Sequence, residues 1–132
     1  MSIPKVIHYC WFGKGEMPKI AKKCIKSWGK YCPDYEIICH NEDNFDLSQN
    51  RYIREAYNAG KWAFVSDFAR LKIIYDNGGI YLDTDVELIK PIDDLLINKG
   101  FMGFDEKGIV ATGLGFGAEK GNEIIGEFLK DY

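Results

Sequence analysis

The chain has 132 residues, which is enough for a single domain, residues 1–132, with one hydrophobic core. Its 46% of hydrophobic and 28% of charged residues are ordinary for a soluble globular protein, and its net charge of -3 gives no indication of a nucleic acid or an anionic membrane as a partner. Neither a signal peptide nor a transmembrane segment is evident, so we expect a cytoplasmic protein, at most peripheral at the inner face of a membrane.

The first part of the chain alternates between segments typical of strands and of helices. Residues 5–12 are β-branched and aromatic and predict a first strand. In residues 18–30, Pro18 suits a first helical turn, and apolar residues follow at helical spacing, starting with Ile20. Residues 35–40 predict a second strand. The lysines of the helix share one face, which we expect to be solvated: Lys19, Lys22, Lys23, Lys26 and Lys30.

The second part of the chain begins with two helical segments, a short one at residues 51–58 and a longer one at residues 62–76. Residues 80–82 form an apolar run that suits a strand buried on both faces, and we expect residues 86–89 to extend it. The remaining expected elements are a helical turn at 91–96, short strands at 101–104 and 114–118, and a final helix capped by Asn122.

Strands and helices in this order predict an α/β fold with a parallel, doubly wound sheet. Ligands of such sheets bind outside the carboxyl ends of the strands. Three segments fall at those ends, residues 9–13, 40–44 and 83–85, and we expect them to form the site.

The last of these segments holds two carboxylates, Asp83 and Asp85, spaced two residues apart. On an extended backbone both side chains point the same way, so both carboxylates should face one small volume. Two such acids repel each other unless a cation lies between them or one of them holds a proton. Carboxylate oxygens suit Mg²⁺ or Mn²⁺, and such an ion attracts a diphosphate.

The preceding helix carries a second polar pair, Asp67 and Arg70, which share a helix face at the spacing i, i+3. The alternative to a binding role is a surface salt bridge of little energetic value. Gly78 is placed to cap this helix, and Gly79 eases the turn into the next strand.

The four cysteines form no C-x-x-C pair, and we expect buried free thiols of a reducing cytosol. A zinc site built from these cysteines with His8 and His40 is conceivable but poorly patterned. We expect His8 to be a structural residue rather than a catalyst.

The composite of S-D-x-x-R at residues 66–70 and G-G-x-Y-x-D-x-D at residues 78–85 resembles the sugar-nucleotide signature of the DXD glycosyltransferases. That family includes capsular-polysaccharide transferases, initiating mannosyl- and galactosyltransferases and, more distantly, the glucosylating domain of large bacterial toxins. The resemblance implies the GT-A fold, a Rossmann-like nucleotide-sugar-binding sheet with flanking helices. It is firm over residues 3–104, and family members are longer, so we expect this chain to be truncated at its C-terminus relative to them, either as a fragment or as a reduced protein.

The resemblance also implies how the base would be bound, because H-Y-C-W-F-G at residues 8–13 is similar to the family's first-strand motif. Trp11 would stack on the nucleobase, and the backbone near Cys10 would hydrogen-bond its edge. Ser66 matches a residue near the ribose or the diphosphate. The alternative for Trp11 is a core position, since an aromatic residue at the end of a strand suits either role.

The other matched residues would hold the sugar and the metal. Asp67 and Arg70 match the pair that grips the donor sugar's hydroxyls, and Tyr81 would lie along the sugar or the ribose. Asp83 would contact ribose and sugar, partly through water, and share the metal site with Asp85, the direct ligand. The four charged residues among these are the expected catalytic residues.

The activity implied is metal-assisted transfer of a sugar, with retention of configuration, in surface polysaccharide biosynthesis. The donor would be a UDP-sugar, or else a GDP-sugar, the cofactor Mn²⁺ or Mg²⁺, and the acceptor a saccharide or a lipid-linked molecule. One alternative is a non-catalytic or partner-dependent module that binds nucleotide-sugars. A HAD-type phosphatase is the other, although its D-x-D should end the first strand and not the third.

Overall fold

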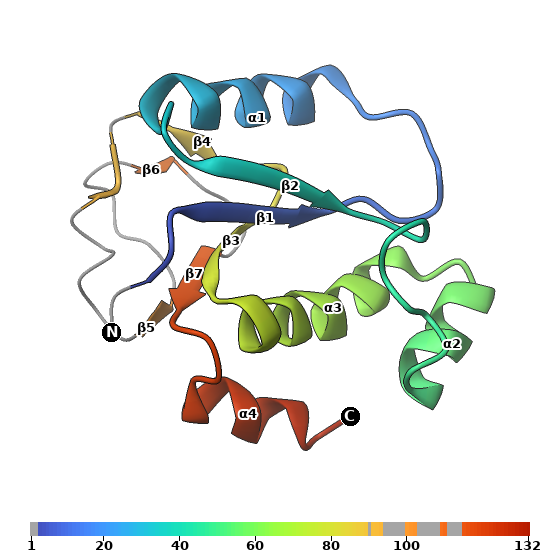
Figure 1. The fold of residues 1–132 in the computed structure, drawn as a ribbon. Helices are drawn as coiled ribbons and strands as arrows, with labels where there is room; N and C mark the ends of the chain where they lie inside the picture. Colours follow the sequence, from blue (N-terminus) through green and yellow to red (C-terminus); the bar gives the residue numbers. More distant parts are fainter. Residues whose placement is uncertain (1–2, 90, 94–99, 103–108, 111–114) are drawn as a thin grey trace.

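The computed structural model describes residues 3–89, 91–93, 100–102, 109–110 and 115–132. The helices are α1 (Lys19–Tyr31), α2 (Arg51–Asn58), α3 (Trp62–Asn77) and α4 (Glu123–Leu129). The strands are β1 (Val6–Cys10), β2 (Glu36–His40), β3 (Gly79–Leu82), β4 (Glu87–Leu88), β5 (Gly100–Met102), β6 (Ile109–Val110) and β7 (Gly115–Ala118). Figure 1 shows α1 on one side of the central sheet and the other three helices on the opposite side. No helix in the described ranges is both long and apolar enough to cross a membrane.

Local sequence signals located most of these elements correctly. The predicted cap of the last helix is confirmed, because the Asn122 side chain accepts hydrogen bonds from the backbone N–H groups of Ile124 and Ile125. The two short late strands are also confirmed in part, as β5 and β7. The rest of their predicted ranges, and the helical turn beyond residue 93, lie outside the described residues.

The expected fully parallel sheet is wrong in its second half. The five-stranded sheet has the order β2-β1-β3-β7-β5. Strand β1 is parallel to β2 and β3, whereas β7 is antiparallel to both β3 and β5. The register pairs Leu82 with Gly115, so β7 begins at the edge where β3 ends. An antiparallel strand does not need the crossover connection that a parallel strand at this place would need.

Residues 86–89 do not extend β3, contrary to expectation. The backbone N–H of Val86 donates to the carbonyl of Asp83 at 3.0 Å, which closes a turn directly after β3. Strand β4 then pairs with β6 in a separate two-stranded ribbon.

Two hydrophobic clusters lie on the two faces of the sheet. The cluster under α1 is centred on Trp28, which is fully buried, and the cluster under α3 includes Phe116 and Tyr81. All four residues of β3 are buried, which confirms the predicted strand with two covered faces. Ile20 was expected on the buried stripe of α1, but its side chain is 58% exposed because it lies on the flank of the helix.

The double glycine between α3 and β3 is required by the geometry of the turn. Gly78 has φ +72° and Gly79 has φ +115°, conformations that residues with a Cβ rarely adopt. A Cβ at Gly79 would lie 2.8 Å from the Val6 carbonyl oxygen and 3.0 Å from His8 Nε2. The close approach of this turn to β1 brings the end of α3 and the start of β3 against the first strand.

His8 ties the same turn to the sheet, as expected of a structural residue. Its Nε2 lies 3.0 Å from the Gly78 carbonyl and its Nδ1 lies 2.9 Å from His40 Nε2. A carbonyl only accepts, so His8 Nε2 carries the hydrogen, and neutral His8 then accepts from His40 through Nδ1. Burial lowers the pKa of His8 and lowers the pKa of His40 to about 4, the neighbouring ring adding to the effect at His40.

This pair predicts that the free energy of unfolding falls as the pH is lowered from about 6.5 toward about 4, since the unfolded chain then binds more protons than the folded one. The variant His40→Gln keeps a donor but does not titrate, so its stability should depend less steeply on pH. Urea unfolding at several pH values checks this. Equal slopes in the two proteins would contradict it.

All four cysteines are free, three of them buried and Cys39 half-buried. Within the described ranges, no three side chains of His, Cys, Asp or Glu gather into a group that could hold a metal ion.

Candidate active site

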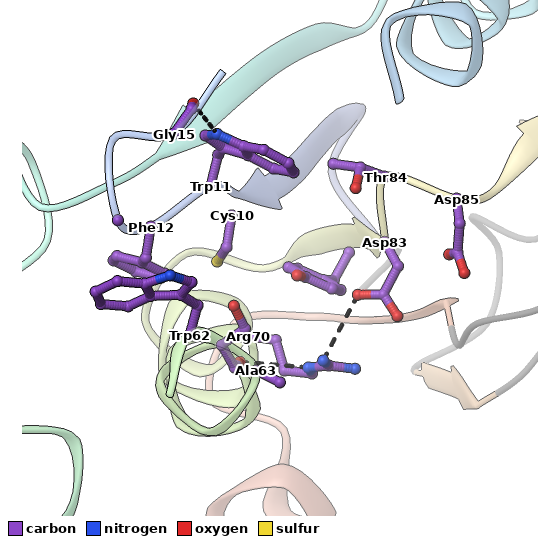
Figure 2. A pocket seen from close by; sticks show the side chains of 13 residues that line it. Cys10, Trp11, Phe12, Gly15, Trp62, Ala63, Arg70, Asp83, Thr84 and Asp85 are labelled. Carbon is purple, nitrogen blue, oxygen red and sulfur yellow. Dashed lines mark hydrogen bonds and ion pairs between the residues drawn. The ribbon is translucent and has the colours of Figure 1, made fainter. Parts of the chain in front are cut away.

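A cleft of about 510 Å³ opens at the carboxyl ends of β1 and β3 (Figure 2). Three parts of the chain form it: the end of β1 with the loop after it, the first half of α3, and the end of β3 with the following turn. The lining residues are Cys10, Trp11, Phe12, Gly13, Gly15, Trp62, Ala63, Ser66, Arg70, Tyr81, Asp83, Thr84 and Asp85. Most of the residues singled out from the sequence are thus brought together at one edge of the sheet.

The third predicted segment, residues 40–44, supports the cleft without lining it. The Trp11 backbone N–H donates to the His40 carbonyl at 2.9 Å. The Gly13 backbone N–H donates to a carboxylate oxygen of Glu42 at 2.7 Å. These two bonds hold the loop after β1 against the end of β2.

Asp83 and Asp85 line the same cleft. The reason predicted from the sequence, two side chains on the same side of an extended backbone, is wrong. Because β3 ends at Leu82, Asp85 lies in a turn and not on extended backbone. Asp83 is half-buried beside Arg70, while Asp85 is exposed. The two carboxylates therefore differ in their surroundings although they share one cavity.

Helix α1 holds the segment that follows this turn. The indole N–H of Trp28 donates to the Val86 carbonyl at 2.8 Å. The Ser27 hydroxyl accepts from the Leu88 backbone N–H at 2.9 Å. Both side chains are buried, so water competes little for these bonds. The acidic turn is consequently fixed by β3 on one side and by α1 on the other.

Arg70 is the central cation of the cleft and its side chain is only 17% exposed. Its guanidinium lies 3.3 Å from the Asp67 carboxylate and 3.6 Å from that of Asp83. It also lies 5.1 Å from the centre of the Tyr81 ring, within the range of a cation–π contact. Asp67 approaches Arg70 from outside the lining of the cleft, so the i, i+3 salt bridge is present and helps to orient Arg70 toward Asp83.

Cys10 and Tyr81 form the buried floor of the cleft. Burial raises the pKa of the Cys10 thiol to about 12 and raises that of Tyr81 well above its usual value. Both groups are therefore neutral at physiological pH. Neither offers a thiolate or phenolate nucleophile.

The aromatic side of the cleft includes a residue that the sequence reasoning missed. Trp11 is half-buried, with its indole N–H donating to the Gly15 carbonyl at 2.8 Å, so it is not a core residue. Trp62 is 40% exposed and packs so closely on Gly13 that a Cβ there would lie 2.5 Å from the indole. Figure 2 shows Phe12 and Trp62 on one side of the cleft and the two aspartates on the other. The signal for Trp62 was its place four residues before Ser66 and eight before Arg70, on the same helix face.

Comparison with known proteins identifies the family of this chain. The family described as "Glycosyltransferase sugar-binding region containing DXD motif" matches residues 18–102. The chain belongs to this family of glycosyltransferases. Inositol phosphoceramide mannosyltransferase 3 of Schizosaccharomyces pombe is 31% identical over 103 residues, which cover 72% of this chain and 28% of that protein. The initiation-specific alpha-1,6-mannosyltransferase of Candida albicans is 30% identical over 105 residues, covering 72% of this chain and 27% of that protein.

The fold of this family member is confirmed by a solved structure. PaToxG glycosyltransferase aligns with a TM-score of 0.72 and 22% identity over 98% of this chain and 60% of its own. The GT-A expectation therefore holds, and the phosphatase alternative loses its support. The chain spans less than a third of the length of the two mannosyltransferases named above.

The residues at the mouth of the cleft fit a divalent ion that is bound together with a diphosphate. Asp83 and Asp85 supply hard oxygen ligands at the mouth of the cleft. Within the described ranges no third acidic, histidine or cysteine side chain completes a metal cage around them. Mg²⁺ is commonly held in this way, by one or two carboxylates and the phosphates of the substrate.

Proposed function

We propose that this domain binds a nucleoside-diphosphate sugar and a divalent ion, Mn²⁺ or Mg²⁺, and transfers the sugar to a saccharide or lipid-linked acceptor with retention of configuration. The observation that carries the proposal is one cleft that is lined by the indoles of Trp11 and Trp62 and by two aspartates beside the half-buried Arg70. A base stacks on aromatic surfaces, and a diphosphate is held by cations, so the two ends of the cleft suit the two ends of the donor.

In this arrangement Trp11 stacks on the nucleobase, and the exposed Trp62 offers a second aromatic surface in the same cleft. The backbone near Cys10 bonds the edge of the base. Ser66 lies next along the same helix face, where the ribose or the diphosphate follows. Arg70 pairs with Asp83 and aims it at ribose and sugar, and Asp67 keeps Arg70 in place.

Transfer requires the sugar–phosphate bond to break, with positive charge growing on the anomeric carbon and negative charge on the leaving diphosphate. When bound at Asp85 and Asp83, the divalent ion offsets that negative charge. Tyr81 packs under Arg70 and lies along the sugar side of the cleft. Because the relatives named above are mannosyltransferases, mannose is the first sugar to test, with GDP- and UDP-sugars compared. A role in surface polysaccharide synthesis, in the cytoplasm, completes the proposal.

The direct test is a thermal-shift screen of nucleotide-sugars with and without Mn²⁺, followed by an assay of donor hydrolysis. At about 100 times its dissociation constant, a ligand that binds only the folded state adds about 2.7 kcal/mol of stability. Metal-free nucleotide should raise the melting temperature less. Binding without hydrolysis would favour a partner-dependent binding module, and no shift with any nucleoside diphosphate and metal would contradict the proposal.

Replacing Trp11 by alanine should weaken nucleotide binding by about 1–3 kcal/mol, the usual contribution of a base stacked on an aromatic ring. Binding of a bare diphosphate should stay unchanged, because the indole faces the base. Phe128→Ala is a matched control, since Phe128 is 40% exposed on α4 and away from the cleft. Isothermal titration with nucleotide and with diphosphate measures both, and an unchanged nucleotide affinity would remove Trp11 from the base site.

A further inference from the structure

The exposed face of α1 carries a stripe of lysines that neither the cleft nor the core uses. At about 100° per residue, the five lysines fall within an arc of about 100°. They lie opposite the buried residues Ala21, Cys24 and Trp28, and the buried Ser27 lies at the edge between the two faces. All five are exposed. The members of this lysine stripe are Lys19, Lys22, Lys23, Lys26 and Lys30.

This arrangement of charge opposes the stability of the helix. Lysines three and four positions apart repel one another, and the helix contains no acidic residue to separate them. Lys19 and Lys22 lie in the first turn, where a basic residue opposes the helix dipole. Pro18 provides no side-chain cap for that turn. An anionic surface laid against the stripe would offset the repulsion among the lysines and their unfavourable interaction with the helix dipole.

Local ion pairs do not neutralise the stripe either. Within the described ranges, the lysines that form ion pairs are others: Lys5, Lys14, Lys72 and Lys130. The chain has 20 acidic against 17 basic residues, so the rest of the molecule is strongly acidic. Apart from these five lysines the chain has 12 basic and 20 acidic residues, so the stripe is opposite in sign to the rest of the molecule, which the net charge of the whole chain does not reveal.

We propose that the lysine stripe of α1 docks this domain on an anionic lipid membrane. Lysine is a compact point charge that suits diffuse attraction to a charged surface, and the stripe holds no arginine fork. Ile20, 58% exposed beside the lysines, can enter the headgroup layer as an interfacial helix requires. The stripe also lacks an exposed aromatic side chain on which the bases of single-stranded nucleic acid would stack.

Docking on this face would place the cleft beside the lipid surface. The loop that leads into α1 includes Gly13 and Gly15, which line the cleft. Figure 1 shows the start of α1 at the same end of the molecule as the carboxyl ends of β1 and β2. The docking proposal is independent of the proposed sugar transfer, because a lysine stripe needs neither donor nor metal to bind lipid.

The test is co-sedimentation with vesicles of phosphatidylcholine, with and without phosphatidylserine as a third of the lipid. The protein should bind only the mixed vesicles, and high salt should release it. The triple variant Lys22→Gln, Lys23→Gln, Lys26→Gln should bind roughly a hundredfold more weakly, given the usual contribution of a lysine near an anionic surface. Its melting temperature should not fall, because the substitutions relieve repulsion.

A matched control removes the same charge elsewhere, with Lys5→Gln, Lys72→Gln and Lys130→Gln, and should bind nearly as the parent protein does. If both triple variants lost the same affinity for the mixed vesicles, binding would depend on the net charge of the protein and not on the stripe. That result would overturn the proposal. Binding to duplex DNA as tight as to the mixed vesicles would overturn it in favour of a nucleic-acid surface. Donor binding, measured by thermal shift on the same stripe variant, should be unchanged, so failure of docking is distinguishable from failure of the proposed transfer.

Discussion

Replacing Asp85 by asparagine should abolish metal-dependent binding of the donor while the protein stays folded. Asparagine keeps the shape of the side chain and loses its charge, so the ion loses its main ligand. The expected loss of metal-dependent affinity is at least about a hundredfold, because even outer-shell partners of a metal typically account for 10–100-fold. Asp85 is exposed in a turn, so the free energy of unfolding should change by about 0.5 kcal/mol or less.

Thermal shift and titration with nucleotide-sugar, with and without Mn²⁺, measure the two effects separately. Asp76→Asn is the matched control, since Asp76 is an exposed carboxylate at the far end of α3, 3.2 Å from Lys72. Asp83→Asn should also weaken binding of the donor, mainly because it alters the contacts that Asp83, which is oriented by Arg70, would make with ribose and sugar. An Asp85→Asn protein that unfolds, yet at low temperature still binds donor and metal as before, would make the acidic pair a structural turn. The resemblance would then extend to the fold alone.

Replacing Gly79 by alanine should lower the free energy of unfolding by about 2–5 kcal/mol, a large part of the stability of a domain this size. The new Cβ would meet the Val6 carbonyl at 2.8 Å, and the φ of +115° is unfavourable for alanine. Because β1 and β3 pair directly at this point, relaxation of one strand disturbs the other.

Gly29→Ala is the control for this substitution, because Gly29 lies inside α1 with no atom within 4 Å of an added Cβ. It should stabilise the protein by about 0.5–1 kcal/mol through helix propensity. Urea unfolding of both variants checks the pair. If Gly79→Ala proved as harmless as Gly29→Ala, the double glycine would not be required by the turn.

Local patterns in the sequence determined much of the outcome. The bounds of α2, the cap at Asn122 and the double glycine before β3 each follow from residues within one turn of the chain. The position of the cleft also followed, because the carboxyl ends of successive parallel strands meet at one edge whatever the details of packing. The composite motif at residues 66–70 and 78–85 indicated the family. The order and periodicity of the strands and helices alone could not have indicated it.

Contacts between distant residues decided the rest. The direction of β7 depends on the edge of the central sheet at which the strand begins. No residue of this short, glycine-rich segment encodes that direction. The ribbon of β4 with β6 depends on the turn closed by Val86 and held by Trp28, which is 58 residues away in the chain. Trp62 came to the cleft because it packs on Gly13, and the charge of Arg70 is shared between Asp67 and Asp83 because α3 and β3 meet there. A sequence records the periodicity and turn chemistry of each segment, whereas the contacts that bring segments together arise only when the sheet has assembled.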